Sequence, residues 1–159
     1  MFHSSKRLSW ENGSIDYDSL NQLVEHSITG GANGLTAPLV ASEVQALSLL
    51  EREELVKAVT GAIGGRLPFI LGASADDAEI CRSFAKLAER VNATAYLVAV
   101  PNALYGRTEE LLSFFRSIAA ASGAPLIIQA VQSGTVLVED ALAEPSSIEH
   151  LMRLRSLSA

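Results

Sequence analysis

The feature that most constrains this sequence is a regular alternation between short apolar runs and longer amphipathic stretches. Between the apolar runs, hydrophobic residues recur at three- and four-residue spacing, which is typical of amphipathic helices. The runs follow each other at roughly 30 residues, the length of one strand-helix unit. They cover residues 34–40, 67–72, 95–100 and 125–129. Strands that are apolar throughout and alternate with such helices predict a parallel sheet covered by helices.

Polar residues at the ends of the amphipathic stretches indicate where helices begin. Ser48, followed three residues later by Glu51, predicts a reciprocal N-terminal cap between a hydroxyl and a carboxylate. Ser74 with Asp77 predicts a second helix start, and Thr108, followed by two glutamates, predicts a third. The predicted helices cover residues 18–29, 48–63, 74–91 and 108–122.

The size of the chain limits which α/β fold it can form. It has 159 residues, of which 48% are hydrophobic, so there is enough apolar material for one packed domain. A closed eight-unit (β/α) barrel typically needs about 250 residues. The alternative at this size is a doubly wound α/β fold, which would place helices on both faces of an open sheet.

Charge and cysteine content argue against several classes of function. The net charge is −6 and the basic residues are scattered, so no nucleic-acid partner is expected. No apolar stretch is long enough for a membrane helix, and the first residues do not resemble a secretory signal. The single cysteine, Cys81, forms no internal disulfide, and the three histidines lie far apart, so no metal or other cofactor is expected. We therefore expect a protein of the reducing cytoplasm.

Several segments follow one another in an order and spacing that a known enzyme family shares. They are Gly13–Asp16, Gly30–Leu35, Leu47–Glu54, Pro68–Gly72, Tyr96–Pro101 and Glu109–Pro125. Together these segments, over about residues 12–129, resemble the N-terminal portion of the dihydrodipicolinate synthase and N-acetylneuraminate lyase family. Members of that family are class I aldolases on a (β/α)8 barrel.

The resemblance implies a fold and a chemistry. The fold would be a partial (β/α)8 TIM-barrel-like domain of about five βα units, with residues 1–159 forming one truncated domain. In the family, a lysine on the sixth strand forms an imine with the keto carbon of pyruvate. A tyrosine on the fifth strand relays protons, helped by a threonine and a second tyrosine. The pyruvate carboxylate binds in a loop after the second strand.

The carboxylate loop and the second tyrosine differ from the family pattern in this chain. The loop aligns with Val40, Ala41 and Ser42, where both family hydroxyls are missing and only Ser42 could substitute in part. Ala103 stands where the family has its second tyrosine. Tyr105, two residues further on, is expected to be a surface or interface aromatic instead.

The two central catalytic positions also differ. Gln129 replaces the fifth-strand tyrosine, and a carboxamide has no proton to exchange near neutral pH. The family lysine would fall near Arg155, whose guanidinium cannot form an imine. The lysines of the chain are Lys6, Lys57 and Lys86, and the last two fall in predicted helices. We therefore expect class I aldolase chemistry to be lost.

Two interpretations of function follow. The chain is either a pyruvate-dependent lyase or synthase by descent, or a non-catalytic scaffold that acts as a binding or interaction module. The expected ligand is a small keto acid. An open half barrel exposes sheet edges and an apolar inner face, which predicts a homo-oligomer or a partner chain that completes the barrel.

Overall fold

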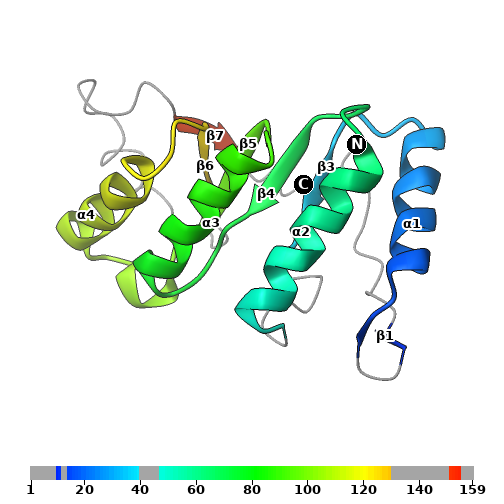
Figure 1. The fold of residues 1–159 in the computed structure, drawn as a ribbon. Coiled ribbons are helices and arrows are strands. Elements are labelled where there is room, and N and C mark those ends of the chain that lie inside the picture. Colours follow the sequence, from blue (N-terminus) through cyan, green and yellow to red (C-terminus); the bar gives the residue numbers. More distant parts are fainter. Residues whose placement is uncertain (1–9, 12–13, 40–46, 130–150, 155–159) are drawn as a thin grey trace.

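The computed structural model describes residues 10–11, 14–39, 47–129 and 151–154, which form helices alternating with short strands (Figure 1). The helices are α1 (Tyr17–Thr29), α2 (Leu49–Ile63), α3 (Ala78–Arg90), the 3-10 turn η3 (Asn102–Leu104) and α4 (Thr108–Ala119). The strands are β1 (Trp10–Glu11), β2 (Ser14–Ile15), β3 (Leu35–Ala37), β4 (Phe69–Gly72), β5 (Ala95–Ala99), β6 (Leu126–Gln129) and β7 (Leu151–Leu154).

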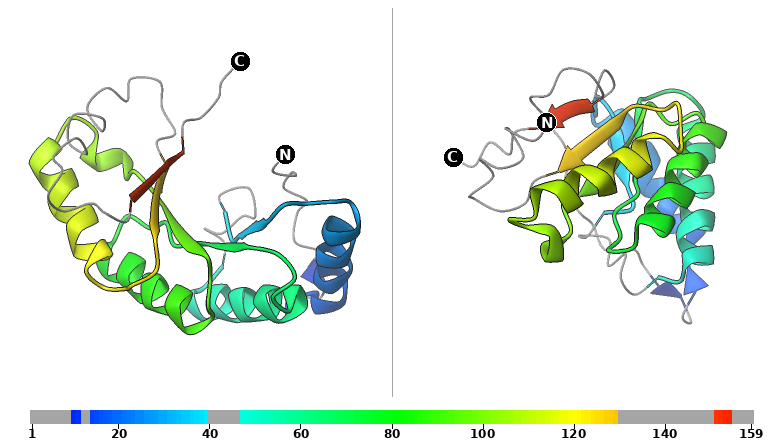
Figure 2. Two further views of the ribbon diagram at one scale, coloured as in Figure 1. Left: turned by 90° about the horizontal axis from the view of Figure 1, so that it is seen from above. Right: turned by 90° about the vertical axis from the view of Figure 1, so that its left-hand side faces the viewer.

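The main sheet has five parallel strands in the order β3-β4-β5-β6-β7, and β1 and β2 form a separate antiparallel pair. Each strand therefore lies beside the next strand in the chain, as in a barrel, whereas a doubly wound sheet reverses its order. The left view of Figure 2 shows the strands as an arc with the helices along its outer side. With the helices of the described residues on one face, the doubly wound alternative is wrong.

Two apolar clusters separate the outer and inner faces of the sheet. The outer cluster joins the helices to alternate strand residues such as Leu71, Tyr96 and Val98. The inner cluster contains Ala95, Leu97 and Ile127, and Leu39 and Ile70 pack against it. We expected an exposed inner face, but these three residues are only 3–4% exposed, so that expectation is wrong for them. The curvature of the sheet brings their side chains together.

The ends of the helices confirm part of the prediction and correct the rest. Ser48 and Glu51 form the predicted reciprocal cap of α2, and Gly64 ends that helix in a left-handed conformation with φ 55°. The N-cap of α3 is Asp77 and not Ser74, because the Asp77 carboxylate accepts from the Glu79 N–H at 2.7 Å. Helix α4 begins at Thr108 as predicted but ends at Ala119, earlier than expected.

Strand β7 lies in the region that the sequence analysis left without a regular element. Its sequence, Leu-Met-Arg-Leu, contains a charged residue and is too short to show an alternation. It pairs with β6 in parallel, with Leu151 beside Leu126 and Leu154 beside Gln129. None of the helices in the described part of the chain has the length and apolar character needed to cross a membrane.

Candidate functional site

The carboxyl ends of the parallel strands meet at one edge of the sheet, where barrel enzymes place their active sites. In this chain, β3 and β4 approach each other very closely at that edge. A side-chain carbon on Gly72 would overlap the carbonyl oxygen of Pro38, so only glycine fits there. This contact sets the position of the chain as it leaves β4.

Three residues lie side by side at the carboxyl ends of β4, β5 and β6, and we call them the strand-end row: Ser74, Ala99 and Gln129. The Ser74 Oγ accepts a hydrogen bond from the Ala99 N–H at 2.9 Å. Ala99 is the register partner of Gln129, and the Val100 N–H donates to the Gln129 carbonyl at 3.0 Å. The ends of β4, β5 and β6 are therefore joined at one level.

Gln129, which aligns with the family tyrosine, is the last residue of β6 and is half-buried. Because side chains alternate along a strand, Gln129 lies on the same face as Ile127 of the inner cluster. Its carboxamide forms no hydrogen bond with any other described side chain or backbone group. It can therefore donate and accept hydrogen bonds at the inner face of the strand ends.

Ala103 and Tyr105, the two candidates after β5, do not join the strand-end row. Ala103 is exposed in η3. Tyr105 follows η3 and is partly buried against the outer cluster, so it is not a fully exposed surface aromatic, and its place at an interface stays a prediction. Val40, Ala41, Ser42 and Arg155 lie outside the described residues.

Arg52 is a buried side chain that the sequence analysis missed. It lies on α2, is only 6% exposed, and its guanidinium carbon is 4.3 Å from the centre of the Phe84 ring. Its Nη2 donates to the Ser74 carbonyl oxygen at 3.3 Å, whereas its Nε has no hydrogen-bond partner among the described residues. The signal was its position three and four residues before Leu55 and Val56, which places it on the buried stripe of the helix.

The electrostatic surroundings of Arg52 are unusual for a buried cation. Among the described residues, the ion pairs within 4.0 Å do not include Arg52. Burial away from water lowers the pKa of the Arg52 guanidinium. The group nevertheless stays protonated at neutral pH, because an arginine is charged up to very high pH. The positive charge of Arg52 therefore lies next to the Ser74 backbone carbonyl.

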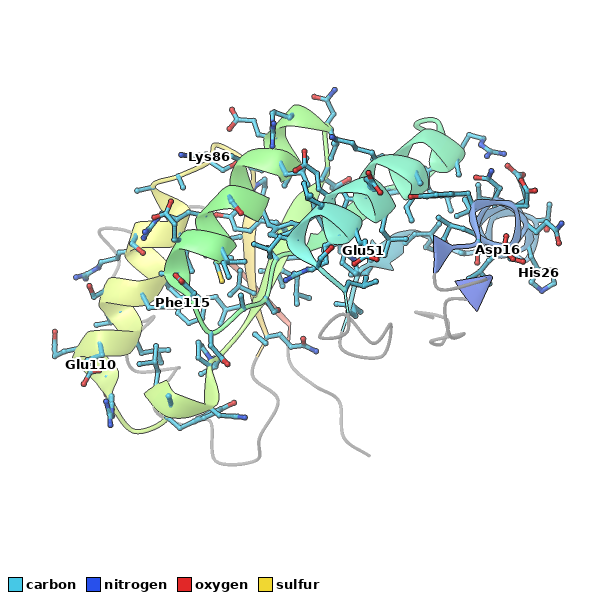
Figure 3. All side chains as sticks on the ribbon, turned by 60° about the horizontal axis from the view of Figure 1, so that its bottom comes forward. Asp16, His26, Glu51, Lys86, Glu110 and Phe115 are labelled. Atoms are coloured by element: carbon cyan, nitrogen blue, oxygen red, sulfur yellow. The ribbon has the colours of Figure 1, made fainter. Side chains whose placement is uncertain are left out.

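The described lysines and the cysteine lie away from the strand-end row. Lys57 on α2 is exposed and pairs with Glu53 at 2.9 Å, and Lys86 is exposed on α3 (Figure 3). Burial raises the pKa of the Cys81 thiol to about 11, so the thiolate does not form near neutral pH. Within the described ranges, no three His, Cys, Asp or Glu side chains come together as a metal site requires.

A hollow of about 730 Å³ lies at the opposite edge of the sheet. It is lined by residues at the amino ends of β4 and β5 and at the end of α2, including Lys57, Arg66 and Thr94. Both nearby cations are already paired, Lys57 with Glu53 and Arg66 with Glu25. We therefore place the candidate site at the carboxyl ends, where uncharged polar groups remain available.

Comparisons with known proteins agree with the fold. Residues 9–158 match the model of the Dihydrodipicolinate synthetase family. The 4-hydroxy-tetrahydrodipicolinate synthase of Laribacter hongkongensis is 28% identical over 151 residues, which cover 94% of this chain and 52% of that protein. The chain thus spans about half the length of this curated relative.

Two solved structures place the described strands in the context of a barrel. N-acetylneuraminate lyase from Mycoplasma synoviae has a TM-score of 0.78 at 19% identity, and the match covers 91% of this chain and 49% of the lyase chain. The chloride-inhibited dihydrodipicolinate synthase from Acinetobacter baumannii, complexed with pyruvate, has a TM-score of 0.67 at 28% identity. The match covers 75% of this chain and 41% of that protein. The predicted partial barrel is confirmed, and the chain belongs to the dihydrodipicolinate synthetase family.

Proposed function

We propose that this chain is a non-catalytic member of the family, in which the strand-end row binds a small keto acid without forming a covalent bond. The ligand class follows from family membership and from a related structure that was solved with pyruvate. The loss of chemistry follows from the residues of this chain. In this account the protein is a binding scaffold of the cytoplasm that keeps the barrel geometry and lacks the aldolase reaction.

The observation that carries the proposal is strand β7. The family resemblance makes β6 the fifth barrel strand and β7 the sixth, where the family places its imine-forming lysine. β7 reads Leu-Met-Arg-Leu, and its last residue, Leu154, is level with Gln129. The next residue in the sequence is Arg155. A guanidinium has no free amine at neutral pH and cannot attack a carbonyl carbon.

The two lysines in the described part of the chain do not replace the missing amine. Lys57 and Lys86 are exposed on helices of the outer layer, and Lys57 lines the hollow at the opposite edge of the sheet. An exposed amine stays protonated near neutral pH and is a poor nucleophile. Gln129 likewise has no titratable proton to relay. Each step of imine chemistry therefore lacks its group in the described part of the chain.

Retained pyruvate-dependent lyase or synthase activity is the alternative, and the name of the Laribacter relative favours it. Reductive trapping separates the two. The protein is incubated with pyruvate and borohydride, and its intact mass is measured, with the Laribacter enzyme as the positive control. We expect the mass of a reduced pyruvate adduct in the control and the unmodified mass in this chain. An adduct on any of its lysines would contradict the proposal.

We further propose that the protein associates through the edges of its sheet. β3 and β7 each have one neighbouring strand within the described part of the chain. Unpaired backbone groups along a strand edge favour pairing with another chain. The partner is either a second copy or a chain that completes the barrel.

A further inference from the structure

We propose that Ser74 and Gln129 donate hydrogen bonds to the carboxylate of the bound keto acid, and that the buried Arg52 acts as a positioning residue whose charge selects this anion. This inference rests on the proposed function. It assigns a carboxylate site to the ends of β4 and β6, away from the loop after β3 that the family resemblance would suggest.

The Ser74 hydroxyl oxygen is held in place by one hydrogen bond, and its own hydrogen remains available for a ligand. Its oxygen accepts from the Ala99 N–H at 2.9 Å, which fixes the position of Oγ. A hydroxyl also carries one hydrogen to donate, and that hydrogen reaches no other described residue. Ser74 is half-buried, so this donor is partly shielded from water. It is therefore a preformed donor at the strand ends.

Gln129 supplies the second donor on the other side of Ala99. Neighbouring strands lie roughly 4.8 Å apart, so two strand spacings separate the chain at Ser74 from the chain at Gln129. Ala99 between them carries only a methyl group and is itself half-buried. The methyl group of Ala99 is the only side chain that stands between the hydroxyl and the carboxamide in the row, so in this proposal the carboxylate binds over Ala99 and accepts from both.

Arg52 favours an anion at this place without touching it. Arg52 lies on α2, and its guanidinium donates to the Ser74 carbonyl oxygen at 3.3 Å. It is 6% exposed, and no carboxylate among the described residues pairs with it. A charge in a poorly polarisable interior is screened weakly, so the positive potential of Arg52 extends past the Ser74 backbone to the strand-end row.

Two acidic residues, Asp76 and Asp77, lie between β4 and α3 close to Ser74, and neither neutralises the charge of Arg52. The Asp77 carboxylate accepts from the Glu79 N–H at 2.7 Å and faces the positive end of α3. Asp76 is exposed, and water screens its charge. The neutral donors of the row and the cation behind it together favour a monocarboxylate over an uncharged ligand.

The test compares pyruvate with pyruvamide, which has the same size and no charge. Dissociation constants are measured by ¹⁵N NMR titration of the wild type, Ser74→Ala, Arg52→Met and Arg52→Lys, following the Ala99 amide. We expect Ser74→Ala to weaken pyruvate binding about tenfold, as the loss of a hydrogen bond to a charged group does. Arg52→Met should weaken pyruvate binding at least fivefold and leave pyruvamide binding unchanged, and Arg52→Lys should restore most of the loss. Ser83→Ala, an exposed serine on α3, is the matched control.

The selectivity for charge distinguishes this role from a structural one. If Arg52→Met weakened both ligands equally, or if Ser74→Ala left pyruvate binding unchanged, the inference would be wrong. A wild type that binds no pyruvate, or an imine adduct in the trapping experiment, would contradict the proposed function and overturn this inference with it. Pyruvate binding by the wild type, combined with either of the two variant results above, would overturn this inference alone.

Discussion

The end of β4 lies directly against the chain after β3, because Gly72 has no side chain to collide with the Pro38 carbonyl oxygen. We predict that Gly72→Ala lowers the free energy of unfolding by roughly 1–3 kcal/mol, as overpacking against a rigid backbone atom does. Urea unfolding measures the change. Gly61→Ala is the control, because Gly61 lies within α2 with open space around it. That change should stabilise the protein by up to about 1 kcal/mol. Equal effects of the two substitutions would contradict the close approach at the strand ends.

Arg52 has an energetic signature as well as a role in selectivity. A buried cation costs free energy unless a partner compensates it, so an apolar side chain of similar length should be tolerated. We predict that Arg52→Met leaves the free energy of unfolding unchanged or raises it by about 1–4 kcal/mol. Urea unfolding at pH 7 tests this. A loss of about 3–5 kcal/mol, the size seen when one partner of a buried ion pair is removed, would contradict this prediction.

Among the elements, the sequence predicted the strands and helices better than their exact ends. Ser48 and Glu51 gave the correct start of α2 because the cap is a local interaction between residues three apart. Ser74 was misassigned as a cap because its hydroxyl accepts from Ala99, a contact between segments that lie 25 residues apart. β7 was missed because four residues carry too little pattern, and its pairing with β6 depends on the assembled sheet.

The cap of α2 gives a prediction about pH. The Ser48 N–H and Oγ–H both donate to the Glu51 carboxylate, at 2.7 and 2.6 Å, and these bonds lower the pKa of Glu51. A carboxyl whose pKa is lower in the folded state stabilises the fold above its unfolded pKa. This contribution is lost as pH falls through the folded pKa. The stability difference between the wild type and Glu51→Gln should therefore shrink as the pH falls from 7 towards 3. A difference that stayed constant in urea unfolding across this range would contradict the cap.

At the scale of the whole molecule, the sequence predicted the partial barrel but not how its inner face is packed. The alternation of strands and helices and the family segments together indicated the architecture, and the family assignment was confirmed. The inner face was expected to be exposed, yet its residues Ala95, Leu97 and Ile127 are buried and form a cluster. Whether residues 1–159 form one truncated domain stays a prediction. The roles of Gln129 and Ala103 were inferred from alignment, and only ligand binding tests them.

The open edges of the sheet predict association. We expect sedimentation velocity to show a species heavier than the 16.9 kDa chain at micromolar concentration. The reason is that β3 and β7 each present a free edge within the described sheet. Charged substitutions in β7, such as Leu151→Lys, should shift the protein towards the monomer. A stable monomer that binds no hydrophobic dye would contradict this prediction.

The central claim is that this barrel fragment binds a keto acid and leaves its carbonyl intact. The most direct test is ¹³C NMR of [2-¹³C]pyruvate with a stoichiometric amount of the protein. We predict a shifted or broadened ketone resonance that returns to its free position when unlabelled pyruvate is added. A resonance of an imine carbon would contradict the loss of catalysis, and an unperturbed ketone signal would contradict binding.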